Sequence, residues 1–320
     1  MSIIKQALSA IICQSATSAS SHAVSAGDSA VWNRITSSGA GTTASLRPRG
    51  TMTVMSDEYW HSVKVTGMPV PVDRSLEDST VELVGMLDHP DPRLRDDLGV
   101  SVLTTWIGRG VYDELLHGLG DGLVAGLNHG LGRPEDPTVL RRTSSALLLA
   151  EVVNRDTVAQ VLDPGTLLAW GDAAAGWLVR EQDQRGWSAD LGPIHTVANG
   201  ADLLAALARS RHLGRLELTV LLDVVGDLLL SPTPHVWHHG EDDRLAHAVM
   251  TVIHRAVVDR AVVEAWIARL GAGTRPPATR GHASTPWPTP SARNTSATLR
   301  ALYLQLALGV RGRVDLPGDA

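Results

Sequence analysis

The sequence contains no phenylalanine, only three tyrosines and a single cysteine, Cys13. One cysteine excludes an internal disulfide framework and a cysteine-ligated zinc domain, and it indicates a reducing compartment, so we expect a cytoplasmic protein. No apolar run reaches the ~18 residues of a transmembrane helix, so no contact with a membrane is expected. Because phenylalanine is missing, leucine, valine and alanine must build the core, and leucine and alanine favour helices over strands.

Lysine is almost missing as well, and arginine supplies nearly all of the positive charge. Residues 1–51 hold four of the 28 basic residues and one of the 34 acidic ones, so the rest of the chain carries 24 basic and 33 acidic groups. A body with this net charge of −9 repels phosphate backbones. Nucleic acid is therefore not an expected partner.

The chain divides into two regions of different composition. Residues 1–55 are rich in Ser, Thr, Ala and Gly without a hydrophobic period, which predicts a disordered segment. A start of translation at Met52 or Met55 is an alternative to a native segment here. From about Ser75 one helical pattern follows another, and we expect a single α-helical repeat domain over residues 75–310, with a flexible insertion at 271–293 where Pro, Gly, Thr and Ser accumulate.

Predicted helix starts recur at regular distances. Pro92, Pro137, Pro193 and Asp243 each follow turn residues, and they are 45, 56 and 50 positions apart, with one further helix between successive starts. A period of about 40–47 residues with two helices per unit is typical of HEAT and armadillo repeats. The predicted fold is therefore all-α, a HEAT/armadillo-like α-solenoid of antiparallel helix pairs. An irregular all-α domain is the alternative.

Two further patterns indicate core packing. Glycines are frequent between 118 and 132, but the leucines among them have helical spacing, which favours a closely packed helix over a phosphate-binding loop. Four tryptophans fall on apolar helix faces and are expected in the core: Trp106, Trp170, Trp177 and Trp266.

Four sequence blocks together resemble a known family. They cover 94–107, 131–145, 181–202 and 240–245, and the third is the most specific, with Glu-x-Asp-x-Arg-Gly-Trp at 181–187. They resemble the bacterial DUF2785 family of unknown function, although the family has Trp where Pro193 stands and a second His where Asn199 stands. The resemblance implies a helical array and no known activity.

The third block also carries the residues best suited to chemistry. Three polar residues at i, i+4 and i+7 are expected on one side of a helix that opens at Gly192-Pro193: His195, Asn199 and Asp202. Three charged residues end the preceding helix: Glu181, Asp183 and Arg185. Three interpretations stay open: a buried network that fixes the helix pair, a ligand or peptide pocket, and acid–base or metal chemistry. A metal would use His195, Asp202 and either Glu181 or Asp183, but Asn199 is a weak ligand, so no metal and no cofactor is predicted.

A second polar cluster precedes and opens a later helix: His235, His238, His239, Glu241, Asp242, Asp243 and His247. It is dense enough to bind a divalent metal adventitiously. The favoured interpretation is instead a solvated turn followed by an acidic helix N-terminus, where carboxylates interact favourably with the helix dipole. In that case Arg244 would pair locally.

These patterns lead to one expected function and one alternative. In a solenoid the second helices line the concave side, where we expect Arg95, Asp96, Arg141, Arg142, His195, Asn199, Asp202 and Arg244, joined by Glu181, Asp183, Arg185, Glu241 and Asp242 as a ligand-binding or structural polar network. We predict a non-catalytic interaction module whose polar concave surface takes a protein segment or a small polar ligand. The alternative is an enzyme, such as a metal-assisted hydrolase, centred on Glu181, Asp183, Arg185, His195 and Asp202. An enzyme requires these groups to converge on one point, whereas a module spreads them along a groove.

Overall fold

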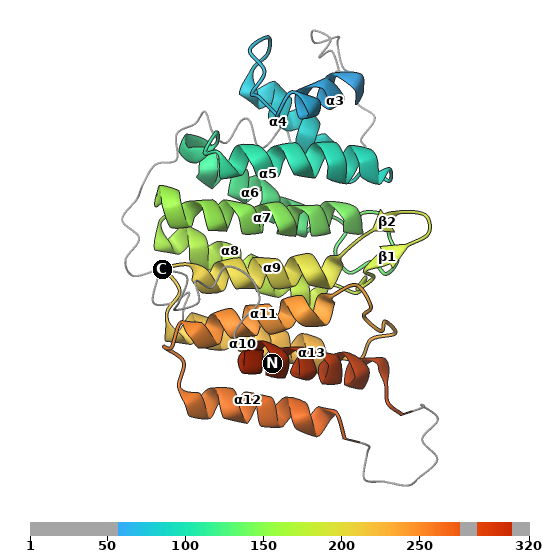
Figure 1. Cartoon of the computed structure of the whole chain (residues 1–320), viewed down its shortest axis with the longest axis vertical. Coiled ribbons are helices and arrows are strands. Elements are labelled where there is room, and N and C mark those ends of the chain that lie inside the picture. Colours follow the sequence, from blue (N-terminus) through green and yellow to red (C-terminus); the bar gives the residue numbers. More distant parts are fainter. Residues whose placement is uncertain (1–56, 276–286, 309–320) are drawn as a thin grey trace.

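The computed structural model describes residues 57–275 and 287–308, and it is almost entirely helical (Figure 1). The elements are α3 (Asp57–Val65), α4 (Leu76–Gly85), the π-helix η1 (Arg93–Val100), α5 (Ser101–Gly108), the short 3-10 helix η2 (Asp113–Leu115), α6 (Leu116–Leu127), α7 (Val139–Ala159), α8 (Pro164–Arg180), β1 (Trp187–Ser188), β2 (Gly192–Pro193), α9 (Thr196–Arg209), α10 (Arg215–Leu230), α11 (Glu241–His254), α12 (Arg260–Gly273) and α13 (Pro290–Leu308). The prediction of an all-α fold is confirmed.

Two domain predictions fall partly or wholly outside these ranges. The segment 1–55 lies outside the described residues. The expected insertion at 271–293 is shorter at both ends, because α12 continues to Gly273 and α13 already begins at Pro290; its centre, 276–286, lies outside the described residues. Within the described ranges, no helix has both the length and the apolar content needed to cross a bilayer.

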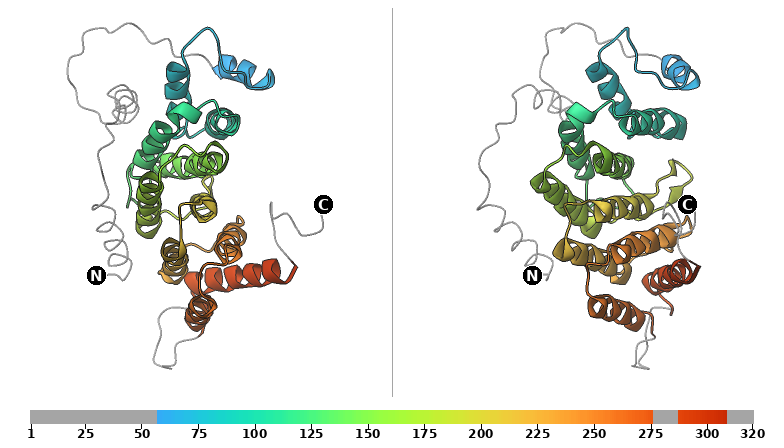
Figure 2. Two further views of the ribbon diagram at one scale, coloured as in Figure 1. Left: turned by 90° about the vertical axis from the view of Figure 1, so that its left-hand side faces the viewer. Right: turned by 60° about the vertical axis from the view of Figure 1, so that its left-hand side comes forward.

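The helices form two rows (Figures 1 and 2). In the first row α6, α8, α10 and α12 follow one another in contact, and in the second row α5, α7, α9, α11 and α13 do the same. Each first-row helix is followed in the chain by its second-row partner, and successive pairs begin 48, 51 and 45 residues apart.

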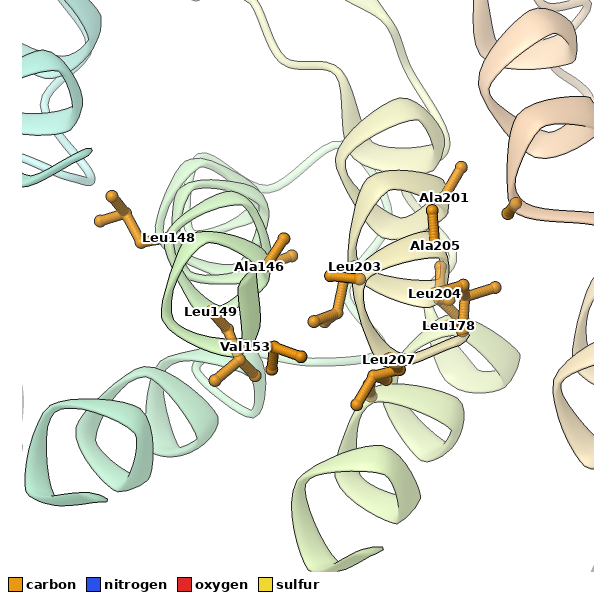
Figure 3. Close-up of a cluster of buried hydrophobic side chains, with 14 of the residues drawn as sticks. Ala146, Leu148, Leu149, Val153, Leu178, Ala201, Leu203, Leu204, Ala205 and Leu207 are labelled. Atoms are coloured by element: carbon orange, nitrogen blue, oxygen red, sulfur yellow. The ribbon is translucent and has the colours of Figure 1, made fainter. Parts of the chain in front are cut away.

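The core fills the space between the two rows. Figure 3 shows Leu149 and Val153 of α7, Leu203 and Leu207 of α9, and Leu178 of α8 within one buried cluster. All five are at most 2% exposed. Burying one such side chain stabilises the fold by about 1.5–3 kcal/mol. Five such side chains from α7, α8 and α9 therefore contribute several kcal/mol-scale terms to the stability of the fold.

The glycine-rich helix is closely packed, as its leucine spacing predicts. A methyl group on Gly120 of α6 would lie 2.0 Å from Cη2 of Trp170 on α8, so only glycine lets the two helices approach this closely. The four tryptophans expected in the core are 0–5% exposed. Trp170 also donates its indole N–H to Asp121 at 2.9 Å.

One arginine contact recurs along the second row. Near the ends of α7, α9 and α11, a guanidinium donates to a backbone oxygen at the end of the preceding second-row helix. The three bonds join Arg155 to Gly108 O at 3.4 Å, Arg211 to Asp156 O at 3.2 Å and Arg255 to Ala208 O at 2.6 Å. A cation at a helix C-terminus satisfies free carbonyls and opposes the helix dipole.

The predicted start of α9 at Gly192-Pro193 is wrong. These two residues form β2, which pairs antiparallel with β1, and the helix begins at Thr196. The N–H groups of Ile194 and His195 both donate to the carbonyl of Gly186, at 2.9 and 3.0 Å, and this holds the chain in a turn. His195 takes a left-handed conformation with φ 58°. It therefore precedes the helix and does not share a helical stripe with the residues that follow it.

Candidate functional site

The innermost charges of the predicted network form a closed ion pair between α7 and the end of α8. The side chains of Arg142 and Glu181 are 0% and 2% exposed, and they bind in a bidentate manner with N–O distances of 2.5 and 3.0 Å. Glu181 also accepts the indole N–H of Trp177 at 2.9 Å and the backbone N–H of Asp183 at 3.0 Å. Two charge-assisted and two further bonds occupy both carboxylate oxygens.

The next carboxylate of the block is bound just as tightly. Asp183 is fully buried and binds Arg185 through two bonds of 2.8 and 2.7 Å. This hydrogen bond raises the pKa of the Arg185 guanidinium. The carbonyl of Arg185 accepts the hydroxyl of Thr196 at 3.3 Å, so the pair also fixes the start of α9.

Two further arginines fasten loops to helices. Arg95 is 1% exposed and donates to the carbonyls of Leu191 and Pro193 at 3.2 and 2.8 Å, which ties the β1–β2 turn to η1. Its other edge binds Asp96, whose side chain is 42% exposed. Arg141 of α7 donates to the carbonyl of Val84 at the end of α4, and burial lowers the pKa of Arg141.

His195 lies at a corner between α9 and α11. Burial lowers its pKa, the charge of Arg244 lowers it further, and Glu241 opposes both effects. His239 and Asp96 are the other charged or titratable neighbours that influence it. The Nδ1 atom of His195 is buried and has no hydrogen-bond partner among the described residues.

Glu241 is buried in the same corner, contrary to the solvated turn expected for the second cluster. It is 1% exposed, accepts the backbone N–H of His239 at 2.7 Å and lies 3.8 Å from Nδ1 of that histidine. Gly186 covers it so closely that a methyl group there would be 2.4 Å from its Oε1. Asp242 lies half-buried in the first turn of α11, where a carboxylate complements the helix dipole.

The other two residues of the third block take separate partners. Asn199 is buried and donates to the hydroxyl of Thr143 on α7 at 3.0 Å. Asp202 forms an ion pair with Arg244 of α11. The expected local pairing of Arg244 is therefore wrong, because the guanidinium reaches across to the neighbouring second-row helix.

Asp202 and Arg244 belong to a row of polar and charged residues that crosses three second-row helices. We call this row the polar strip. Its members are Glu151 and Asn154 of α7, Asp202 and Arg209 of α9, and Arg244 of α11. Arg209 donates to Asn154 at 3.0 Å. Burial raises the pKa of Glu151, and the nearby charge of Asp202 raises it further. Four members are half-buried and Arg209 is exposed.

Sequence reasoning missed three members of the polar strip. Glu151 carries a usable signal, since it is the one charge within the apolar run 146–153. Arg209 ends the Leu- and Ala-rich pattern of α9, and Asn154 follows Glu151 by three positions, on the same helix face.

The predicted residues are thus divided among several contacts. Glu181 binds Arg142, Asp183 binds Arg185, Asp202 binds Arg244, and His195 stands near Glu241. In the part of the chain that the structure describes, no three His, Cys, Asp or Glu side chains are arranged to hold a metal ion.

Comparison with known proteins adds a family but no function. No curated protein and no solved structure matches the chain. Residues 127–304 match the family described as "Protein of unknown function (DUF2785)". Since the match covers more than half of the 320 residues, the chain belongs to the DUF2785 family.

Proposed function

We propose that this protein is a non-catalytic interaction module that binds a protein segment along the polar strip. One observation carries the proposal. Glu181, Asp183 and Arg142, which sequence reasoning singled out, bind one another or their neighbours inside the fold, whereas the polar strip lies at the surface across α7, α9 and α11. Charges that already satisfy one another inside a protein fix its shape and are not available to a substrate.

The proposal includes a HEAT-like α-solenoid in a reducing compartment. The two rows, the repeat of 45 to 51 residues and the recurring arginine contact support a stack of equivalent helix pairs. Such stacks present the surface of one helix row to their partners. The presence of a single cysteine, Cys13, supports a location in the reducing cytoplasm.

The mixture of charges suits a polypeptide. The polar strip holds two carboxylates, Glu151 and Asp202, and two guanidiniums, Arg209 and Arg244, so backbone amides, carbonyls and side chains of either sign find complementary groups. A phosphate backbone would meet as many carboxylates as cations and gain little. The strip therefore favours a protein partner of mixed charge.

The enzyme alternative has weaker support. A general base needs a free lone pair within reach of the substrate, and both oxygens of Glu181 are already occupied by donors. Asp183 is fully buried beneath Arg185.

Site-specific photocrosslinking tests the proposal. A photoreactive phenylalanine analogue replaces Val158, which is 70% exposed and lies one turn beyond Asn154 on α7. The control position is Asp172, which is exposed on first-row helix α8. We expect protein adducts in cells at Val158 and not at Asp172.

A charge swap then shows whether the polar strip carries the binding. Asp202→Arg combined with Arg244→Asp keeps an ion pair but inverts the charge order of the strip. The adducts at Val158 should fall at least tenfold while the unfolding midpoint stays close to that of the wild type. Equal adduct yields at the two positions, or yields unchanged by the swap, would contradict the proposal.

A further inference from the structure

The two ends of the stack of helices carry opposite charge, and both expose apolar side chains. We call residues 57–85, which comprise α3, α4 and the segment between them, the head, and we call the helices α12 and α13 the tail. Head and tail lie at opposite ends of the stack, and the polar strip lies on helices between them (Figures 1 and 2). The inference from the two ends therefore does not depend on the proposed function.

The tail exposes an apolar surface. Only three of the 14 residues of α12 are charged, and Val262 and Ile267 of this helix are 37% and 36% exposed. On α13, Tyr303 and Leu306 are 70% and 48% exposed. A helix that is apolar on most sides is normally buried, and the terminal repeats of helical stacks normally have a polar outer face. The apolar side chains of the tail therefore indicate that another polypeptide covers it.

The tail is also positively charged. Its two helices contain four arginines and a single acidic residue, Glu264. Glu264 binds Arg260 at 2.6 Å, and Arg269 lies 3.4 Å from a carboxylate of α10. The other two arginines, Arg293 and Arg300 of α13, are exposed and form no ion pair with any residue that the structure describes. Two positive charges of the tail are therefore available to a partner.

The head has the opposite charge. It holds six acidic residues and two basic ones. Both basic residues are already paired, since Arg74 binds Glu82 at 2.8 Å and Lys64 lies 3.7 Å from a carboxylate of η1. Three carboxylates are exposed on the head: Asp57, Glu58 and Asp73. The head exposes apolar side chains as well, because Val65 is 67% exposed and Val72 is fully exposed.

We propose that the tail of one copy of this chain docks on the head of a second copy. The apolar side chains of the tail pack against the exposed valines of the head, and Arg293 and Arg300 face its carboxylates. A contact between two tails would bring their arginines together, and a contact between two heads would do the same with carboxylates, so both symmetric contacts are disfavoured. A head-to-tail contact uses different surfaces of the two copies, so the assembly grows into a chain or closes into a ring.

Sedimentation velocity of the full-length protein tests the association. We expect the sedimentation coefficient of the wild type to rise with protein concentration. A tenfold increase in salt concentration should weaken the association at least threefold, because opposite charges meet at the contact. A wild type that stays monomeric at every concentration, as it would if a different protein covers the tail, would overturn the proposal.

Two variants then show which surfaces meet. The tail variant carries Arg300→Glu and Tyr303→Ser, and the head variant carries Val65→Ser and Val72→Ser. All four side chains are exposed, so both variants should keep the wild-type circular dichroism spectrum. We expect each variant alone to be monomeric. An equimolar mixture should form a dimer that does not grow, because the mixture offers one intact head to one intact tail.

A matched control changes the same types of side chain in the middle of the stack. Arg133→Glu combined with Val179→Ser alters two exposed residues near the ends of α6 and α8, and this variant should associate like the wild type. If the tail variant fails to fold, Arg300→Glu alone takes its place in the mixture. Wild-type association of either end variant, or a mixture that stays monomeric, would show that head and tail do not bind each other.

Discussion

The strongest prediction concerns the buried pair between α7 and α8. Arg142→Met removes the guanidinium and leaves the carboxylate of Glu181, 2% exposed, without its counter-charge. It also removes the bond of 2.8 Å to the carbonyl of His129. Breaking a buried ion pair from one side costs about 3–5 kcal/mol. Because domains are stable by only about 5–15 kcal/mol, the variant should lose a large part of its unfolding free energy.

Urea unfolding followed by tryptophan fluorescence measures this loss. Arg133→Met is the control, since that arginine is 67% exposed and 3.7 Å from Asp136, a surface pair worth about 0–1 kcal/mol. Adding Glu181→Gln to Arg142→Met removes the unpaired charge and should recover about 1–3 kcal/mol. A loss below about 1 kcal/mol in Arg142→Met, or strictly additive effects in the double variant, would refute the account of Arg142 and Glu181 as a closed structural pair.

Three further predictions follow from single contacts. Gly120→Ala places a methyl group 2.0 Å from Trp170 and should destabilise the fold by about 1–3 kcal/mol through overpacking. Alanine is the better helix former by about 1 kcal/mol, which opposes this effect. Calorimetry measures the net change in the unfolding free energy. Asn199→Ala removes the N–H that the buried hydroxyl of Thr143 accepts and should lower the unfolding free energy, measured by urea unfolding, by about 1–3 kcal/mol. The pKa of His195 is lowered from its usual 6.5 in the folded protein, so below pH 6.5 the unfolded chain binds a proton that the folded chain does not, and the unfolding free energy falls as the pH drops below 6.5. His195→Gln should flatten this dependence of the unfolding free energy on pH. An unchanged dependence would contradict the lowered pKa of His195.

Local signals in the sequence were sufficient for most helices. The bounds of α8 are predictable because Asp163 accepts the backbone N–H of Thr166 and Pro164 occupies the first turn. The start of α9 is not predictable in this way. Pro193 suits a first helical turn as well as a strand end, and the choice depends on the carbonyl of Gly186, which accepts two N–H groups from beyond the turn.

In the candidate site, too, contacts between residues close in sequence are predictable and contacts between distant residues are not. Asp183 and Arg185 are two positions apart, so their pairing follows from local geometry. Glu181 has an arginine in its own block, yet it binds Arg142, which is 39 positions away. Composition shows that these charges must be satisfied, but not which helix pair supplies the partner.

The separations of these pairs explain why local spacing was misleading. Arg142 of α7 binds Glu181 at the end of α8 over 39 positions, and Arg244 of α11 binds Asp202 of α9 over 42, so in both cases the partner lies on another helix. A partner on a neighbouring helix lies directly alongside, whereas a residue three or four positions away lies along the same helix. When both are available, burial between helices favours the partner across the interface, because the pair then loses less to competition from water. In this fold, contact with a neighbouring helix is therefore a better guide to the partner of a buried charge than the helical period.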